Sequence, residues 1–146
     1  MHIIKLAVFD MAGTVVNENN VVYKTLQKAI NAGGFQLDLD FVLKHGAGKE
    51  KHQAIKDIIE AEIGNVDTTL AASIFEDFKK LLVYAYKNIT VTSYEGVEEM
   101  LYALKENGIK VALNTGYDTN TAQLLLTKMG WSIGKEYDFL VTADDV

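Results

Sequence analysis

The sequence predicts an α/β protein in which a helical insertion separates the first strand of a parallel sheet from the others. Short apolar runs occur at 3–9, 109–113 and 137–141, and polar or small residues follow each run. Helical spacing of apolar residues fills most of the chain between these runs. Short apolar strands that alternate with helices are typical of parallel α/β sheets. The long helical stretch, 17–88, is expected to form a unit of its own.

The first apolar run, Ile3–Phe9, is expected to be a strand buried on both faces, and Asp10 follows it directly. Packing gives no reason for a carboxylate at the tip of such a strand, whereas ligands of open α/β sheets collect at the carboxyl ends of strands. Gly13 permits a sharp turn, and Thr14 offers a hydroxyl beside the carboxylate. A carboxylate here can attack phosphorus or bind Mg²⁺. The alternative is that Asp10 only caps the turn.

The insertion is expected to contain four helices, because apolar residues recur at helical spacing and caps stand at the ends. Gly33 and Gly34 are expected to end the first helix. The expected helices are Val21–Ala32, a short helix capped by Asp38 or Asp40, a helix through Ala54 and Ile63, and Thr68–Lys87.

Gly46-Ala47-Gly48-Lys49 precedes the third of these helices. This segment is not a phosphate-binding loop, because that motif needs Gly at Leu43 and Ser or Thr at Glu50. Lys49 is therefore either a solvated first-turn lysine or a functional amine, and its own neighbours leave both interpretations open. The histidines lack the i,i+4 pairing of a metal site and are interpreted as ordinary polar residues: His2, His45 and His52.

The second strand, Ile109–Leu113, ends in Asn114-Thr115-Gly116. The hydroxyl of Thr115 and the N–H of Gly116 can hold a phosphoryl group, although the same residues can begin a helix. Asp118 is the better helix cap, which leaves Thr115 for the site. The flanking helices are expected at Tyr94–Asn107 and Thr119–Met129.

The third strand, Tyr137–Val141, is followed by Thr142, Asp144 and Asp145. Two carboxylates can bind a metal ion, but acidic residues are mostly found on the surface, and both are interpreted as structural.

The composition indicates a folded protein of one or two compact units, since 49% of its 146 residues are hydrophobic. A net charge of −6 and the lack of a basic run argue against a nucleic-acid partner. No segment approaches the length of a membrane span, and cysteine is absent, so a cytoplasmic location is expected. Every basic residue is lysine, which is unusual for a phosphate-handling enzyme.

Asp10-Met11-Ala12-Gly13-Thr14 resembles the first motif of the haloacid dehalogenase superfamily, in the form found in phosphonatases (phosphonoacetaldehyde hydrolases) and related hydrolases. Most phosphatases of the superfamily carry a second Asp where Ala12 stands. The resemblance extends to Asn114-Thr115-Gly116 and to the residues from Phe139 to Val146, and thus covers the chain in order.

The resemblance implies a Rossmann-like core at 1–16 and 89–146, and an α-helical cap at 17–88. It implies that Asp10 is the nucleophile and, with the backbone carbonyl of Ala12, a Mg²⁺ ligand. Thr14, Thr115 and Gly116 are expected to hold the phosphoryl group. In phosphonatases a cap lysine forms a Schiff base with the aldehyde substrate, and Lys49 lies at about that place.

These residues predict a Mg²⁺-dependent phosphohydrolase with an aspartyl-phosphate intermediate, acting on a small phosphorylated or phosphonate substrate. Ala12 favours phosphonate cleavage, because an alkoxide leaving group needs a general acid and an enamine leaving group does not. The alternatives are a phosphomonoester phosphatase and an inactive domain or phospho-acceptor module. In receiver domains, however, the accepting Asp follows the third strand and an acidic pair follows the first, the reverse of the order here. A homodimer is left open.

The third and fourth superfamily motifs are expected beyond Val146, which implies that the sequence is the N-terminal part of a longer enzyme. The resemblance also implies a strand order of third, second, first. Ile3–Phe9 would then be an exposed apolar edge, and the 146-residue chain by itself is expected to associate through that edge and to lack hydrolase activity.

Overall fold

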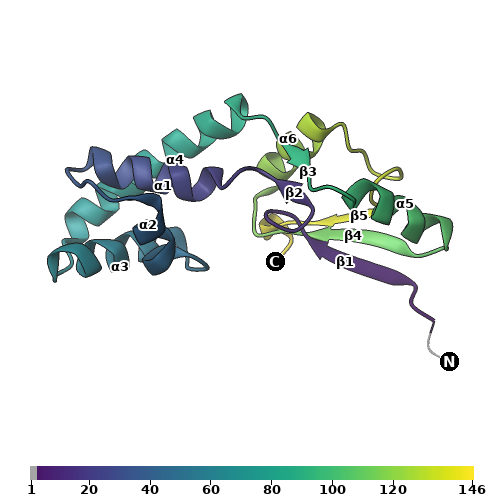
Figure 1. Cartoon of the computed structure of the whole chain (residues 1–146), viewed down its shortest axis with the longest axis horizontal. Coiled ribbons are helices and arrows are strands. Elements are labelled where there is room, and N and C mark those ends of the chain that lie inside the picture. The colour runs from purple at the N-terminus through teal and green to yellow at the C-terminus, as the bar shows by residue number, and fades with distance from the viewer. Residues whose placement is uncertain (1–2) are drawn as a thin grey trace. The chain divides into compact units, whose positions relative to one another are not determined.

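A computed structural model of the chain describes residues 3–146, so His2 lies outside the described residues. The chain divides into two compact units (Figure 1). The sheet unit comprises the residues up to Asn19 together with Ile89–Val146, and the helical unit comprises Asn20–Asn88.

The sheet unit is built on three parallel strands, β1 (Leu6–Asp10), β4 (Lys110–Asn114) and β5 (Phe139–Val141). Their order is β1-β4-β5, so the order expected from the sequence is confirmed. In the register of the sheet, Val8 pairs with Ala112 and Ala112 pairs with Phe139. The carboxyl ends of all three strands therefore lie side by side at the same end of the sheet. Asp10, Thr14, Thr115 and Gly116, which the sequence predicted as site residues, lie at this end or directly follow it.

Strand β1 is not buried on both faces, and that expectation was wrong. The side chains of Leu6 and Val8 are 48% and 58% exposed, whereas Ala7 and Phe9 are half-buried. Leu6 and Val8 point to the exposed face of the sheet, whereas Ala7 and Phe9 point to the other face. On that covered face, Ala7 and Phe9 pair with Val111 and Leu113 of the central strand β4, which are fully buried.

Helices α5 (Val97–Glu106) and α6 (Thr119–Met129) belong to the same unit, and α5 packs on β4. Figure 1 shows both helices on one side of the sheet. The sequence predicted that this helix begins at Tyr94, but α5 begins at Val97. The residue before it, Gly96, has a φ of +82°, which is not helical. The buried side chains under these helices are Leu101, Ala122, Leu125 and Leu126.

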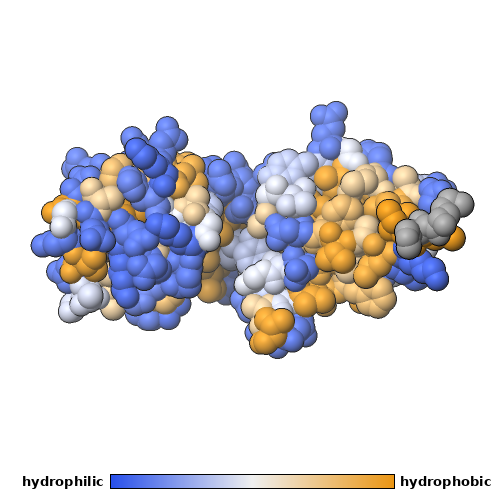
Figure 2. Space-filling view, turned by 90° about the horizontal axis from the view of Figure 1, so that it is seen from below, coloured by the Kyte–Doolittle hydropathy of each residue, from blue (hydrophilic) through white to orange (hydrophobic). Residues whose placement is uncertain are grey.

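The other face of the sheet is apolar and exposed, and Figure 2 shows it as a hydrophobic area. We call it the open sheet face and define it by Leu6, Val8, Phe139 and Val141, which are 39–58% exposed. Exposed apolar surface on an edge strand favours pairing with other chains, because the edge also presents unpaired backbone N–H and C=O groups.

Val8→Lys is expected to reduce self-association of the 146-residue chain, since a charged edge residue opposes strand pairing. Val83→Lys is the control, because Val83 is 56% exposed but lies in the helical unit. Sedimentation velocity should show oligomers for the unchanged chain and the control, and a shift towards monomer for Val8→Lys. A monomeric unchanged chain would contradict the prediction.

A short antiparallel ribbon of β2 (Val16–Asn17) and β3 (Thr92–Ser93) was not predicted. It joins the segment that enters the helical unit to the segment that leaves it. Directly after β2, Asn19 and Asn20 both have positive φ angles, 56° and 57°. Asparagine tolerates this conformation better than most residues, and the N–H of Asn19 donates to Oδ1 of Asn17 at 3.1 Å.

The helical unit contains the four expected helices, α1 (Val21–Ala32), α2 (Leu39–Gly46), α3 (Lys51–Ile63) and α4 (Thr68–Asn88). Asp38 is the cap of α2, because its carboxylate accepts from the N–H of Phe41 at 2.8 Å. Within residues 3–146, no helix is both long and apolar enough to span a bilayer. The core of the unit is formed by Leu26, Ile30, Val42, Ile55, Ile58, Ile59, Ile74 and Phe78, among others.

Candidate active site

The candidate site starts at Asp10, the last residue of β1. Asp10 pairs in register with Asn114, the last residue of β4, so two polar side chains end adjacent strands. The carboxylate of Asp10 is exposed and accepts a hydrogen bond from the hydroxyl of Thr14 at 3.3 Å. Asp10 thus presents an accessible carboxylate at the carboxyl end of β1, the position that the sequence predicted for it.

The loop after β1 is held by the carbonyl of Met11, which accepts from the N–H groups of Thr14, Val15 and Val16 at 2.9–3.1 Å. Met11 is itself fully buried and anchors the loop. Gly13 has a φ of +76°, a conformation that glycine adopts without strain. The loop thus turns back on itself and brings Thr14 beside Asp10.

At the end of β4, Thr115 is 8% exposed, and its N–H continues the ladder by donating to the carbonyl of Val141 at 3.0 Å. Its hydroxyl accepts from the N–H of Tyr117 at 3.2 Å. A Cβ built on Gly116 would meet no atom within 4 Å, and its φ is not positive. Neither sterics nor the backbone requires glycine there, and the space beside the strand ends is open.

Asp118 caps α6, as the sequence predicted. Its carboxylate accepts from the N–H and the hydroxyl of Thr121 at 2.9 and 2.7 Å. These bonds, the backbone bond most of all, lower the pKa of the Asp118 carboxyl. Capping is thus assigned to Asp118, and the hydroxyl of Thr115 is not needed for it.

Asp118→Ala is expected to lower the free energy of unfolding by about 1 kcal/mol near neutral pH. Because the folded pKa is lowered, the contribution of the carboxylate is complete above the unfolded pKa of about 3.9 and is lost as the pH falls through the folded pKa. Urea unfolding should therefore show that the difference in the free energy of unfolding between the unchanged protein and Asp118→Ala becomes smaller at acid pH. Asp118→Asn retains a capping oxygen and is the control. If Asp118→Ala lowered the free energy of unfolding equally at neutral and at acid pH, the assignment of the Asp118 carboxylate as the cap of α6 would be contradicted.

The carboxylates of the loop after β5 accept hydrogen bonds within the sheet unit, which agrees with their structural interpretation. Asp145 accepts from the N–H and the hydroxyl of Thr142, at 2.7 and 3.1 Å, in a capping box. Asp144 accepts from the N–H of Thr119 at 2.8 Å, which ties the loop to the start of α6.

Lys49 belongs to the helical unit and lies just before α3. The adjacent Glu50 caps that helix by accepting from the N–H groups of His52 and Gln53, both at 2.9 Å, and these bonds lower its pKa. The chain's own carboxylate therefore occupies the helix N-terminus, which agrees with the rejection of a phosphate-binding loop.

Sequence reasoning missed the partner of Lys49. Asp57 forms an ion pair with the Nζ of Lys49. A carboxylate eight residues after a lysine gives no local signal. His52, interpreted from the sequence as an ordinary polar residue, stacks on Phe75 with ring centroids 5.0 Å apart, and its Nε2 is buried without a hydrogen-bond partner among the described residues.

The donor set at the end of β1 fits Mg²⁺. Magnesium usually takes one or two carboxylates and completes its octahedral shell with waters and substrate oxygens. The exposed carboxylate of Asp10 meets this modest requirement. Residues 3–146 contain no cluster of three or more His, Asp or Glu side chains suited to a metal.

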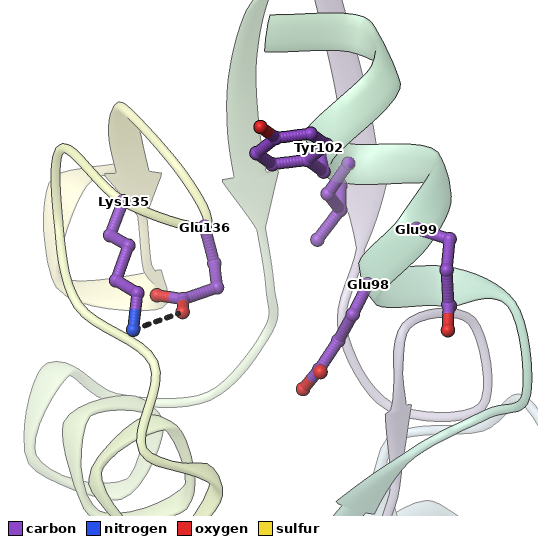
Figure 3. A pocket seen from close by; sticks show the side chains of 6 residues that line it. Glu98, Glu99, Tyr102, Lys135 and Glu136 are labelled. Atoms are coloured by element: carbon purple, nitrogen blue, oxygen red, sulfur yellow. Dashed lines mark ion pairs between the residues drawn. The ribbon is translucent and has the colours of Figure 1, made fainter.

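A hollow of about 470 Å³ lies elsewhere in the sheet unit, between α5 and the segment before β5 (Figure 3). Three carboxylates line it, from Glu98, Glu99 and Glu136. Glu98 accepts from the indole N–H of Trp131 at 2.9 Å, and Glu136 pairs with Lys135 at 3.5 Å. Because three carboxylates and a single lysine line this hollow, it does not suit a phosphate, and no predicted site residue lines it.

Solved structures establish the fold class. The chain matches a haloacid dehalogenase-like protein from Agrobacterium tumefaciens str. C58 with a TM-score of 0.75, at 18% identity, over 97% of this chain and 60% of that one. It matches a predicted phosphoglycolate phosphatase from Haemophilus somnus 129pt with a TM-score of 0.73, at 23% identity, over 98% and 64%. At these identities the likeness shows the fold, a Rossmann-like α/β core with a helical insertion.

The sequence model of haloacid dehalogenase-like hydrolases matches residues 4–146. The chain therefore belongs to the haloacid dehalogenase-like hydrolase family, and the resemblance seen in its motifs is confirmed.

Among curated relatives, phosphonoacetaldehyde hydrolase of Bacillus cereus (strain G9842) is 28% identical over 153 residues, which cover 98% of this chain and 57% of the relative. Phosphonoacetaldehyde hydrolase of Bacillus mycoides (strain KBAB4) is 36% identical over 73 residues, covering 50% of this chain and 27% of the relative. The chain thus spans 57% of the length of the first of these relatives.

Proposed function

We propose that this protein is a Mg²⁺-dependent hydrolase that cleaves the carbon–phosphorus bond of a small phosphonate such as phosphonoacetaldehyde. The observation that carries the proposal is Ala12, which stands two residues after the accessible carboxylate of Asp10. An alanine there cannot protonate a leaving alkoxide, a step to which a general acid contributes about 10²–10⁴-fold. The similarity to phosphonoacetaldehyde hydrolases supports the same chemistry.

In this proposal an oxygen of Asp10 attacks the phosphorus atom, and the carbon–phosphorus bond breaks. The electron pair of that bond passes to carbon, which is stabilised as an enamine when Lys49 has first formed an imine with the aldehyde. The enamine carbon then takes a proton from water, which restores an imine. Water hydrolyses the aspartyl-phosphate to phosphate and the imine to acetaldehyde, which frees the amine of Lys49. Mg²⁺, held by Asp10 and the Ala12 carbonyl, would offset the negative charge of the phosphoryl oxygens.

Three further residues support the transfer of the phosphoryl group. Thr14, whose hydroxyl already contacts Asp10, and Thr115 at the end of β4 would donate to its oxygens. The open space at Gly116 would let an oxygen approach the backbone N–H. The helical unit would serve as the cap that carries Lys49.

The imine provides the decisive test. Borohydride reduction in the presence of phosphonoacetaldehyde should attach mass to Lys49 of the unchanged protein, located by peptide mass spectrometry. Lys49→Arg keeps the positive charge but cannot form the imine, so it should lose both the adduct and phosphonate hydrolysis. Lys56→Arg, in the helix α3 that follows Lys49, is the control. Hydrolysis of phosphomonoesters without any Lys49 adduct would refute phosphonate cleavage and favour the phosphatase alternative.

A further inference from the structure

The side chain of Lys49 is held in place by two residues of α3. Its Nζ pairs with Oδ2 of Asp57, while Oδ1 of Asp57 accepts from Nε2 of Gln53 at 2.7 Å. Gln53 and Asp57 are four residues apart and share one helix face. Both carboxylate oxygens of Asp57 are therefore engaged, and the hydrogen bond from Gln53 on the same helix orients the carboxylate towards Lys49.

The backbone of the same segment is also restrained. The N–H of Gly48 donates to the hydroxyl of Tyr23 on α1 at 3.1 Å, and the N–H of Lys49 donates to the carbonyl of Gly46 at 3.3 Å. The ammonium group of Lys51 lies 5.1 Å from the centre of the Tyr23 ring and donates to the carbonyl of Lys49. The backbone of Lys49 is thus held by hydrogen bonds, and its side chain ends at a carboxylate that is also held by a hydrogen bond.

This arrangement opposes imine formation. An imine forms when the lone pair of a neutral amine attacks a carbonyl carbon, and an ammonium paired with a carboxylate has no lone pair. We propose that Asp57 acts as a gate that holds Lys49 as an ion-paired ammonium, and that Lys49 reacts with the aldehyde only after it leaves Asp57. The inference rests on the proposed function of Lys49.

The chemical step balances without any further reagent. On leaving Asp57, the ammonium gives one proton to water, and the neutral amine attacks the aldehyde carbon. The carbonyl oxygen takes back that proton and a second one from the attacking nitrogen and departs as water, so a protonated imine remains. The pair is open enough for this exchange, since the side chains of Lys49 and Asp57 are 45% and 27% exposed.

Several other titratable groups lie near the Lys49 segment, but the Nζ of Lys49 forms its ion pair with Asp57. Hydrogen bonding by Lys49, and then by Gln53, lowers the pKa of the Asp57 carboxyl, so the gate remains charged at neutral pH. The neighbouring groups are Glu50, Lys51 and His52 at the start of α3, Tyr23 on α1, His45 at the end of α2, and Glu76 on α4, whose charge interacts with His52.

Reductive methylation of the folded chain tests the gate, because formaldehyde with cyanoborohydride reports the reactivity of each lysine amine. Asp57→Asn should raise the rate at Lys49 about two- to fivefold near pH 7.5, the effect of an exposed ion pair. Glu60→Gln is the matched control, since it removes one exposed carboxylate from the same helix. The other lysines are internal references.

Asp57→Glu keeps a carboxylate and should keep Lys49 slow, which separates the charge effect from a change in packing. Equal rates at Lys49 in Asp57→Asn and Glu60→Gln would refute the gate, even if phosphonoacetaldehyde is trapped on Lys49 and the proposed function stands. A faster rate in Asp57→Asn without any trapping of phosphonoacetaldehyde on Lys49 would refute the proposed function, while the restraint of Lys49 by Asp57 would stand.

Discussion

Asp10→Asn is expected to lower kcat for phosphonate or phosphate-ester hydrolysis by a factor of about 10⁴ or more, as removal of a nucleophile does in other enzymes. The amide has the shape of the carboxylate but not its nucleophilicity. The fold should be unchanged, because the side chain is exposed and its oxygen can still accept from Thr14. Release of inorganic phosphate by the intact protein, with Mg²⁺ present, measures the effect.

Asp144→Asn is the matched control for this experiment. Asp144 is also an exposed carboxylate after a strand of the same sheet, but it accepts from the N–H of Thr119 and serves the loop. We expect less than about a tenfold change, since surface substitutions of this kind alter stability by about 1 kcal/mol or less. Substantial turnover by Asp10→Asn would refute the role of Asp10 as nucleophile.

Ile58→Ala should destabilise the helical unit by about 2–5 kcal/mol, the usual cost of removing a fully buried aliphatic side chain. Ile58 is 0% exposed, and α2 approaches it closely: a Cβ on Gly46 would lie 2.9 Å from Cδ1 of Ile58. The cavity left by alanine would thus lie between α2 and α3. Urea unfolding followed by helical circular dichroism provides the measurement.

The same helix offers a control for Ile58. Ile63, the last residue of α3, is 51% exposed, so Ile63→Ala should change the free energy of unfolding by less than about 0.5 kcal/mol. Comparable losses for the two substitutions would show that α3 does not pack as described.

The helices could be predicted closely because their signals are local. Asp38 and Asp118 cap α2 and α6, and Gly130 ends α6 with a φ of +74°. The position of Asp10 at the end of β1 was equally local, since an apolar run followed by a carboxylate and a glycine indicates a strand end. These features depend on residues within one or two turns of each other, which a sequence displays directly.

Other features depend on partners far along the chain and could not be predicted. The residues Leu6–Asp10 do not themselves distinguish an edge strand from a central one, because both are largely apolar, and the edge position of β1 was expected only from the family resemblance. The ribbon of β2 and β3 has two residues per strand and therefore no periodicity. The pair of Lys49 and Asp57 requires the side chain of Lys49 to reach past the first turns of α3.

The β2–β3 ribbon also bears on the order in which the protein folds. Strand β1 pairs with β4, and their paired residues Leu6 and Lys110 enclose a long loop that contains the whole helical unit. The contacts of that unit lie within Asn20–Asn88, so it can become compact before the sheet closes. Its ends then lie near each other, and the flexible loop shrinks to roughly a third of its length.

Shortening the loop in this way reduces the entropic cost of joining β1 to β4 by about 1 kcal/mol. Pairing of Val16–Asn17 with Thr92–Ser93 fixes the shortened loop, because it joins the chain on either side of the helical unit. Formation of the helical unit before the sheet would therefore favour the pairing of β1, which carries Asp10, with β4.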